Sequence, residues 1–579
     1  KYYKNKKESA FIMKKQTKLV AVLSTAALLA IGASMTSFAA TGWAEEDGTW
    51  VYYNRDGERA TDSWKKSGNN WYYLDSDGEM AIDQLIEDGD NYYYVDINGV
   101  MASNQWVAIE NEDAGEDDEP EHYWYYFQAN GKALTNGDNS NIALKTINGK
   151  KYAFDEEGKM LYGWVAEDNA ERIDNTDGDG FKEGDYYFGG EDDGAMTVGW
   201  LQMDITYDEA TSDYEVSPVF NDDEDQTRWF YFKSNGKKVK AENGDTQKSK
   251  TINGKKYEFD QYGAMTAEWS LDVDTASTSG IRGDYSTATH SVSAKYAQQW
   301  RYFQDVENGA RVSKGWFKVV SAEYLNYDKY NDDEDAWYYA DGSGNLYAGE
   351  FKTIKGKKYA FRNDGRMVNG LKFIKEDEAN QSLSVYADDH DTYNFDNEDD
   401  FLDHAAEFYE PNGYKCFYFG DGDDGAMRTN KTSVAIDGDN YNFYFEKSGS
   451  KKGAGKTGEK DDKYYQSGML LKAGKDEKYQ VVKTLDPTID KNDAGEGLKG
   501  YKKLDDVKTF LEELGMDTTS AYTTDPSKVS LSKLNITKSA DNIDELYVIP
   551  EKDDNNQAVK GKYFIVNTSG KVIDSKSRN

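Results

Sequence analysis

The chain has 579 residues and a net charge of −38. A field of this sign repels the phosphate backbone of nucleic acid, which argues against a nucleic-acid partner, and it keeps a long chain soluble. Hydrophobic residues make up 37% of the chain and aromatic residues 14%. We therefore expect many small cores built from rings between glycine turns, in place of one large aliphatic core.

An export signal is predicted at the start of the chain. Met13 is followed by three lysines, an apolar run over residues 19–31 and a small-x-small cleavage site ending at Ala39. This order is typical of a secretory signal peptide, and the apolar run is shorter than the roughly 20 residues that span a bilayer. Residues 1–39 are therefore interpreted as an upstream extension, residues 1–12, plus a signal peptide. The exported chain is not expected to span a membrane.

Residues 40–109 contain a regular 21-residue repeat. Its leading positions are Trp43, Trp64, Leu85 and Trp106, and a second aromatic residue follows seven residues after each of the first three. Each unit predicts two short strands, the second with an aromatic triplet, closed by an Asp/Gly turn. A lone hairpin cannot bury both of its faces, so successive hairpins must stack. The expected fold class is all-β, a repetitive β-hairpin solenoid.

Residues 110–475 continue this pattern with insertions. The block KTINGKKYAF at 145–154 recurs with one change at 250–259 and at 352–361, which indicates a larger module of about 100 residues. Polar, acidic segments are inserted between a leading Trp and its triplet, for example at 110–121, 221–225 and 331–335. Charge runs are usually solvated loops; loops that contact a partner are the alternative.

Residues 476–579 differ in character, because aromatic residues become rarer. Leu504, Val507, Leu511 and Leu514 stand at helical spacing before Gly515, which predicts one short helix over 501–515. The segment 561–573 resembles half of a hairpin. We interpret this region as a cap on, or an insertion in, the last repeat.

The 21-residue spacing, the GW pairs at Trp43, Trp164, Trp200 and Trp316, and the WYY triplets before Asp/Gly turns resemble choline-binding, or cell-wall-binding, repeats. Related repeats occur in glucan-binding proteins and clostridial toxins. The resemblance covers about residues 41–475. It implies a β-hairpin superhelix that holds choline on the teichoic acid of a Gram-positive cell wall.

The resemblance also implies where choline would bind. In this family a cage takes the leading Trp and first triplet aromatic of one repeat and an aromatic of the next. The first candidate cage is then Trp43, Trp50 and Tyr72 or Tyr73. The second is Trp64, Trp71 and Tyr93, and later candidates use Trp164, Trp200, Trp269 or Trp316. A quaternary ammonium suits ring faces because it donates no strong hydrogen bond. For each ring, packing in the core is the alternative.

No catalytic or metal-binding constellation is found. The four histidines, His122, His290, His390 and His404, are far apart and lack a metal-ligand spacing. Cys416, the single cysteine, excludes an intrachain disulfide framework and is expected to be a packed side chain. The Asp/Gly runs at 175–180 and 420–425 are interpreted as turns. We expect no enzyme, cofactor or metal site.

The sequence thus predicts a secreted, non-catalytic surface protein that binds the bacterial cell wall noncovalently through choline-type ligands. One alternative is an adhesin that binds glucan or host glycan by stacking its rings on sugars. Another is a surface factor that binds a host protein through the loops of residues 110–430.

Overall fold

The computed structural model describes residues 41–115, 119–173, 179–206, 225–242, 247–271, 292–386, 395–408, 413–475, 479–504 and 563–572. The chain divides into two compact units. Unit 1 lies within residues 1–275 and 302–311, and unit 2 within 276–301 and 312–579. The predicted signal peptide lies outside the described residues.

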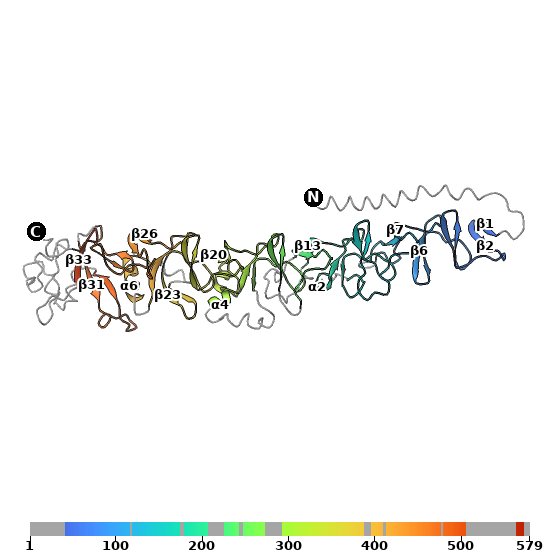
Figure 1. The fold of residues 1–579 in the computed structure, drawn as a ribbon. Helices are drawn as coiled ribbons and strands as arrows, with labels where there is room; N and C mark the ends of the chain where they lie inside the picture. The colour runs from blue at the N-terminus through green and yellow to red at the C-terminus, as the bar shows by residue number, and fades with distance from the viewer. Residues whose placement is uncertain are drawn as a thin grey trace, which may run out of the picture. The chain divides into compact units, whose positions relative to one another are not determined.

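Unit 1 is a series of two-stranded antiparallel hairpins that follow one another along the chain (Figure 1). This confirms the prediction of a repetitive β-hairpin fold. The hairpins are β1 (Gly42–Glu46) with β2 (Thr49–Tyr53), β3 (Ser63–Ser67) with β4 (Asn70–Leu74), β5 (Gln84–Asp88) with β6 (Asn91–Val95), β7 (Gln105–Glu110) with β8 (His122–Phe127), β9 (Lys145–Ile147) with β10 (Lys150–Tyr152), β11 (Trp164–Val165) with β12 (Tyr186–Tyr187), β13 (Gly199–Ile205) with β14 (Gln226–Phe232) and β15 (Lys248–Ile252) with β16 (Lys255–Phe259). A short helix, α2 (Asp179–Glu183), lies between β11 and β12 in the sequence, and β17 (Trp269–Leu271) and β18 (Trp300–Tyr302) lie either side of residues 272–291.

The strand register places each leading Trp directly opposite an aromatic residue of its own hairpin. Trp43 pairs with Tyr52, Trp64 with Tyr73 and Trp200 with Tyr231. Successive side chains of a strand point to opposite faces. The two rings of each pair therefore lie on the same face, which turns toward the next hairpin.

Backbone hydrogen bonds and close packing join successive hairpins. After the hairpin β15–β16, the Met265 amide donates to the Trp229 carbonyl of the preceding hairpin at 2.8 Å. The turn glycine of the following repeat, Gly309, then lies over the Met265 side chain. A Cβ on Gly309 would come within 2.3 Å of the Met265 sulfur, and its φ of +46° also favours glycine. Glycine and methionine thus form one contact between neighbouring repeats.

Unit 2 begins with two similar hairpins and ends in larger sheets. The hairpins are β19 (Gly315–Val320) with β20 (Asp335–Ala340) and β21 (Glu350–Ile354) with β22 (Lys357–Phe361). The sheets, in spatial order, are β24-β23-β25, β26-β27-β30-β29-β28 and β32-β31-β33. Their strands are β23 (Leu371–Asp377), β24 (Ser382–Tyr386), β25 (Lys415–Tyr418), β26 (Asn430–Ile436), β27 (Asp439–Phe445), β28 (Gly458–Lys460), β29 (Lys463–Gln466), β30 (Met469–Leu470), β31 (Tyr479–Leu485), β32 (Gly500–Lys503) and β33 (Tyr563–Asn567).

The described helices of unit 2 lie in segments inserted between strands. They are α4 (Ala294–Ala297), α5 (Tyr327–Asn331) and α6 (Glu398–Phe408). Helix α6 buries Phe401, Leu402 and Ala405 in a core with Phe373 and Phe443. The sequence analysis did not predict these helices, because each is short and interrupts a strand pattern.

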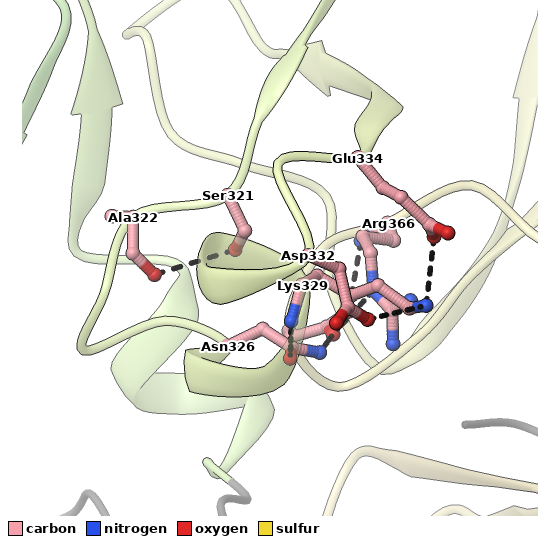
Figure 2. Close-up of polar contacts among 8 residues, drawn as sticks. Ser321, Ala322, Asn326, Lys329, Asp332, Glu334 and Arg366 are labelled. Carbon is pink, nitrogen blue, oxygen red and sulfur yellow. Dashed lines mark hydrogen bonds and ion pairs between the residues drawn. The ribbon is translucent and has the colours of Figure 1, made fainter. Parts of the chain in front are cut away.

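The acidic insertion at 331–335 is held by polar contacts within unit 2. Asn326 caps α5 and donates its side-chain amide to Asp364 at 2.6 Å, and Asp364 also pairs with Arg366 at 2.6 Å. The Lys329 ammonium lies 2.7 Å from the Glu334 carboxylate, and Figure 2 shows these side chains gathered beside the helix. This insertion is therefore anchored, and its charges are partly neutralised within the chain.

The predicted helix over 501–515 is not supported where the structure describes it. Tyr501–Lys503 belong to strand β32, which pairs with β31, and residues 505–515 lie outside the described residues. The predicted hairpin half near the C-terminus does contain a strand, β33, which also pairs with β31. None of the described helices is long and apolar enough to cross a membrane.

Candidate ligand-binding seams

Aromatic rings gather where two successive hairpins meet, and we call each such cluster a seam. Trp200 lies at the centre of one seam. Its ring centroid is 6.2 Å from Trp229 and 5.0 Å from Tyr231 of its own hairpin. It lies 4.9 Å from Tyr257 and 5.8 Å from Phe259 of the next hairpin. Two tryptophans of one hairpin thus lie close to a tyrosine of the next hairpin and to its buried phenylalanine.

Two further seams of the described residues repeat this arrangement. The Trp316 ring lies 6.3 Å from Trp337 and 4.8 Å from Tyr359. The Trp106 ring lies 4.9 Å from Tyr152 and packs in one cluster with Trp124. We call these three the Trp–Trp seams. Their members are Trp106, Trp124, Tyr126, Tyr152 and Phe154; Trp200, Trp229, Tyr231, Tyr257 and Phe259; and Trp316, Trp337, Tyr339, Tyr359 and Phe361.

The leading tryptophans of these seams keep part of their surface in solvent. Trp106, Trp200 and Trp316 are half-buried, whereas the phenylalanine of each seam is fully buried. Of the second tryptophans, Trp229 and Trp337 are also half-buried. Part of the surface of both tryptophans is therefore in solvent in the Trp200 and Trp316 seams, whereas Trp124 of the Trp106 seam is buried.

A carboxylate accepts a hydrogen bond from the second tryptophan of each Trp–Trp seam. The indole Nε1 donates to Asp192 from Trp124 at 3.2 Å, to Glu307 from Trp229 at 3.3 Å and to Asp423 from Trp337 at 2.9 Å. The three acids lie in turns that follow a later hairpin. Hydrogen bonds from Trp337 and Lys318 hold the pKa of Asp423 below its ordinary value, so this group is ionised at neutral pH.

The two N-terminal candidate sites have smaller ring clusters. The Trp43 ring lies 5.5 Å from Tyr52 and 5.2 Å from Tyr72. The Trp64 ring lies 5.1 Å from Tyr73 and 5.0 Å from Tyr93. Of the two tyrosines considered for the first site, Tyr72 therefore contacts the leading Trp43, while Tyr73 belongs to the second site.

The remaining members of these two sites lie at the edges of the clusters. Trp50 is half-buried and stands opposite Glu45 in the hairpin. Trp71 is 40% exposed, and the Lys66 ammonium lies 5.8 Å from its ring centroid. The Trp64 indole donates to Asp88 at 3.2 Å, which again places a carboxylate beside the rings.

Trp164 and Trp269 differ from the other leading tryptophans, because they are only 2% and 4% exposed. Trp164 is enclosed by Tyr187, Phe230 and Phe232. Both tryptophans are candidates for later ligand sites from the sequence; their rings are buried in the structure, and their role in binding stays a prediction.

A groove of about 1180 Å³ lies in unit 1 beside the Trp200 seam. Tyr162, Tyr187 and Trp200 supply aromatic surface to it, and Asp192 and Asp193 supply negative charge. Arg172 supplies positive charge 4.6 Å from the Tyr162 ring. Its walls could therefore accept rings, sugars or cationic groups.

The sequence analysis gave the first triplet aromatic as a cage position but did not name Trp124, Trp229 and Trp337 there, and it missed the carboxylates of the Trp–Trp seams. The tyrosines Tyr152, Tyr257 and Tyr359 occupy the same position of the recurring KTI block, so alignment of the three modules would have indicated them. The carboxylates carry a weaker signal, because the distance in sequence from the tryptophan varies from 68 to 86 residues.

The histidines and the cysteine form no reactive cluster in the part of the chain that is described. His122 lies 3.1 Å from Asp192, and His404 lies 3.2 Å from Asp400 in α6. Cys416 is buried as a packed side chain, and burial raises the pKa of its thiol. Within the described residues, no group of three or more metal-ligating side chains comes together.

Comparison with known proteins places these hairpins in a class of aromatic repeats. Residues 60–106 match the model of the choline-binding repeat. A choline-binding domain from Streptococcus pneumoniae is 33% identical, covering 16% of this chain and 95% of its own, with a TM-score of 0.13. The chain belongs to the choline-binding repeat family.

Two larger proteins share part of the sequence. The modular autolysin LytC from Streptococcus pneumoniae is 19% identical over 58% of this chain, with a TM-score of 0.28. Glucosyltransferase-S from Streptococcus mutans is 23% identical over 248 residues, which is 43% of this chain. The chain spans 56% of the length of the autolysin and 11% of that of the glucosyltransferase.

Proposed function

We propose that this chain is a non-catalytic, secreted module that holds a bacterial cell wall noncovalently by binding choline-type groups in its Trp–Trp seams. The observation that carries the proposal is the repeated set of two tryptophans, a tyrosine from the next hairpin and a carboxylate bonded to the second indole. Choline on teichoic acid is the ligand that membership of the family favours.

Each part of a seam suits a quaternary ammonium. Such a cation offers no strong hydrogen-bond donor, so it gains most from ring faces, at about 0.5–2 kcal/mol for each well-placed contact. The carboxylates add electrostatic attraction that a neutral sugar would not feel. Several weak sites on one chain raise the total affinity for a polymer that displays many choline groups, because later contacts form at high effective concentration.

The proposal is tested by isothermal titration of the chain with choline at 0.5 M salt, where nonspecific attraction to the acidic surface is screened. Trp229→Leu and Trp337→Leu should each reduce the number of bound choline molecules by one. Tyr330→Leu is the matched control, because Tyr330 is 44% exposed and lies outside the seams. Unchanged stoichiometry in both Trp variants would refute the proposed sites.

A second candidate function is binding of a neutral glycan in the groove beside the Trp200 seam. Its volume and the surfaces of Tyr162, Tyr187 and Trp200 would suit sugar rings, and one relative is a glucosyltransferase. Glucan binding that choline does not compete away, and that Tyr162→Ala weakens, would support this function. The host-protein alternative stays a prediction, since the described insertion at 331–335 is paired within the chain.

A further inference from the structure

The Trp164 seam occupies the same position between two hairpins as the Trp–Trp seams. Trp164 stands opposite Tyr187, as Trp200 stands opposite Tyr231. The next hairpin supplies Phe230 and Phe232, at 5.4 and 5.9 Å from the Trp164 ring. The strand register is therefore equivalent in the two seams, which differ in their side chains and in helix α2, inserted between β11 and β12.

Three residues are exchanged in the Trp164 seam. The first is Phe230, which takes the place of Tyr257 in the Trp200 seam. The Lys238 amide donates to the Asp185 carbonyl at 2.7 Å, where the Met265 amide donates to the Trp229 carbonyl at 2.8 Å. Asp185 thus replaces the second tryptophan, and Lys238 replaces the methionine. A Cβ on Gly263 would lie 2.8 Å from Lys238 Cδ, so the lysine stem packs under a turn glycine as Met265 packs under Gly309.

The Lys238 ammonium continues beyond this stem into the rings. Lys238 is only 3% exposed. Its Nζ lies 4.8 Å from the Trp164 ring centroid and 5.9 Å from that of Phe230, and it donates a hydrogen bond to the carbonyl oxygen of Phe181. These are the surroundings that an aromatic cage offers to an external cation.

Helix α2 closes this seam from solvent. Phe181 of α2 is 2% exposed, and its ring lies 6.2 Å from Phe230 and 6.3 Å from Tyr262. The carboxylate of the exchanged Asp185 lies 2.9 Å from the Lys240 ammonium. The nearest groups to the lysine charge are therefore the rings and the Phe181 carbonyl, and Asp185, Asp260 and Lys240 act on it through electrostatic interaction.

We infer that Lys238 is the built-in occupant of the Trp164 seam: its ammonium takes the place of an external cation, so this seam binds no ligand in the wild-type chain. The inference rests on the proposed function only for the ligand class of the other seams. It makes Lys238 the residue that determines how many seams are open. Burial also lowers the pKa of Lys238 to about 7, in agreement with a dry site.

Chemical rescue tests this inference. Lys238→Ala removes a propylammonium group from the seam, so n-propylammonium is the probe and n-propanol its neutral control. The variant should bind one more equivalent of n-propylammonium than the wild-type chain, and the amine should raise its unfolding temperature more than the alcohol does. Equal stoichiometry in the two chains, or equal rescue by the alcohol, would overturn the inference.

A second measurement does not depend on folding of the alanine variant. In the wild-type chain, an amine-acylating reagent should modify Lys238 last among the lysines followed by mass spectrometry, with exposed Lys66 as the reference. Modification of both at the same rate would contradict an enclosed ammonium. Because neither test uses choline, a wild-type chain that fails to bind choline would refute the proposed function and leave this inference to be decided separately.

Discussion

The Trp200 and Trp164 seams share one backbone arrangement but treat positive charge in opposite ways. In the Trp200 seam, Trp200 and Trp229 are half-buried, and the Glu307 carboxylate accepts a hydrogen bond from the Trp229 indole. At Trp164 the rings of Trp164, Phe230 and Phe232 are buried, and the chain supplies its own ammonium from Lys238. The repeat therefore determines where a seam forms, while the exchanged side chains and helix α2 determine whether the seam is open.

The comparison also shows that a recurring motif does not define a recurring ligand site. Both seams begin with a GW pair, and in both the tryptophan pairs with a tyrosine of the second strand of its hairpin. What differs is the residue at the second tryptophan, at the methionine and at the tyrosine of the next hairpin, together with the inserted helix α2. Mutations at these positions should therefore separate packing from binding.

The largest expected effect is on stability at the closed seam. Trp164→Ala should lower the free energy of unfolding by about 3–5 kcal/mol, because it removes a fully buried ring and leaves a cavity. Trp200→Ala should cost clearly less, because part of that ring is already in solvent. Urea unfolding of the two variants measures this difference, and equal losses would contradict the contrast between the seams.

The contrast could be predicted only in part from the sequence. The 21-residue spacing and the GW pairs correctly indicated the hairpins. The two N-terminal candidate sites stay predictions as ligand sites, and within them Trp43 contacts Tyr72 and Trp64 contacts Tyr93. These contacts join neighbouring units of constant length, so the 21-residue spacing is enough to predict which residues meet.

Contacts that cross insertions could not be predicted in this way. The carboxylate at each Trp–Trp seam comes from 68 to 86 residues away, since insertions of different length lie between the partners. For the same reason the sequence did not indicate that Lys238 and α2 close the Trp164 seam. A lysine in a methionine position is visible only once the repeats are aligned in space.

The next effect concerns the buried charge. Lys238→Met should raise the free energy of unfolding by about 1–4 kcal/mol near pH 7. The methionine, which the other seams have at this position, would fill the space of the lysine's aliphatic chain, and no ammonium would have to be desolvated on folding. The folded pKa of about 7 lies below the unfolded value of 10.5, so the unfolded chain binds more protons between these values. The penalty in the wild-type chain, and with it the advantage of the variant, should shrink as pH rises from 7 to 10.

The groups that face Lys238 set the range of that measurement. Lys240, Asp185 and Asp260 interact with its charge. The pKa of Asp260 is itself raised to about 6 by burial, so Asp260 titrates below the range from pH 7 to 10. Urea unfolding of both chains at pH 7, 8.5 and 10 gives the difference, and an advantage that is constant with pH would show that Lys238 is not the titrating group.

A smaller effect is expected from the contact between glycine and methionine. Gly309→Ala should cost about 1–3 kcal/mol more than Gly254→Ala, because the new methyl group would overlap Met265. Both glycines have positive φ, but a Cβ on Gly254 would meet no atom within 4 Å, so the control contains the backbone strain alone. Thermal unfolding compares the two, and equal costs would mean that neighbouring repeats adjust freely at this contact.

The smallest expected effect is on affinity at the open seams. Replacing Asp192 and Asp423 by Asn and Glu307 by Gln keeps a hydrogen-bond acceptor for each indole but removes the charge. Exposed ion pairs contribute about 0.2–1 kcal/mol, so choline should bind up to about fivefold more weakly. The control variant carries Glu58→Gln, Asp138→Asn and Glu378→Gln, which remove the same charge at exposed positions.

Titration with choline at low and high salt separates the two contributions. If the carboxylates act locally, the seam variant should bind choline more weakly than the control variant does. This difference in affinity should shrink at high salt, because salt screens the attraction between the carboxylates and choline. If the two variants bind choline equally, the local carboxylates contribute nothing, and the ring faces that distinguish Trp200 from the enclosed Trp164 would account for binding on their own.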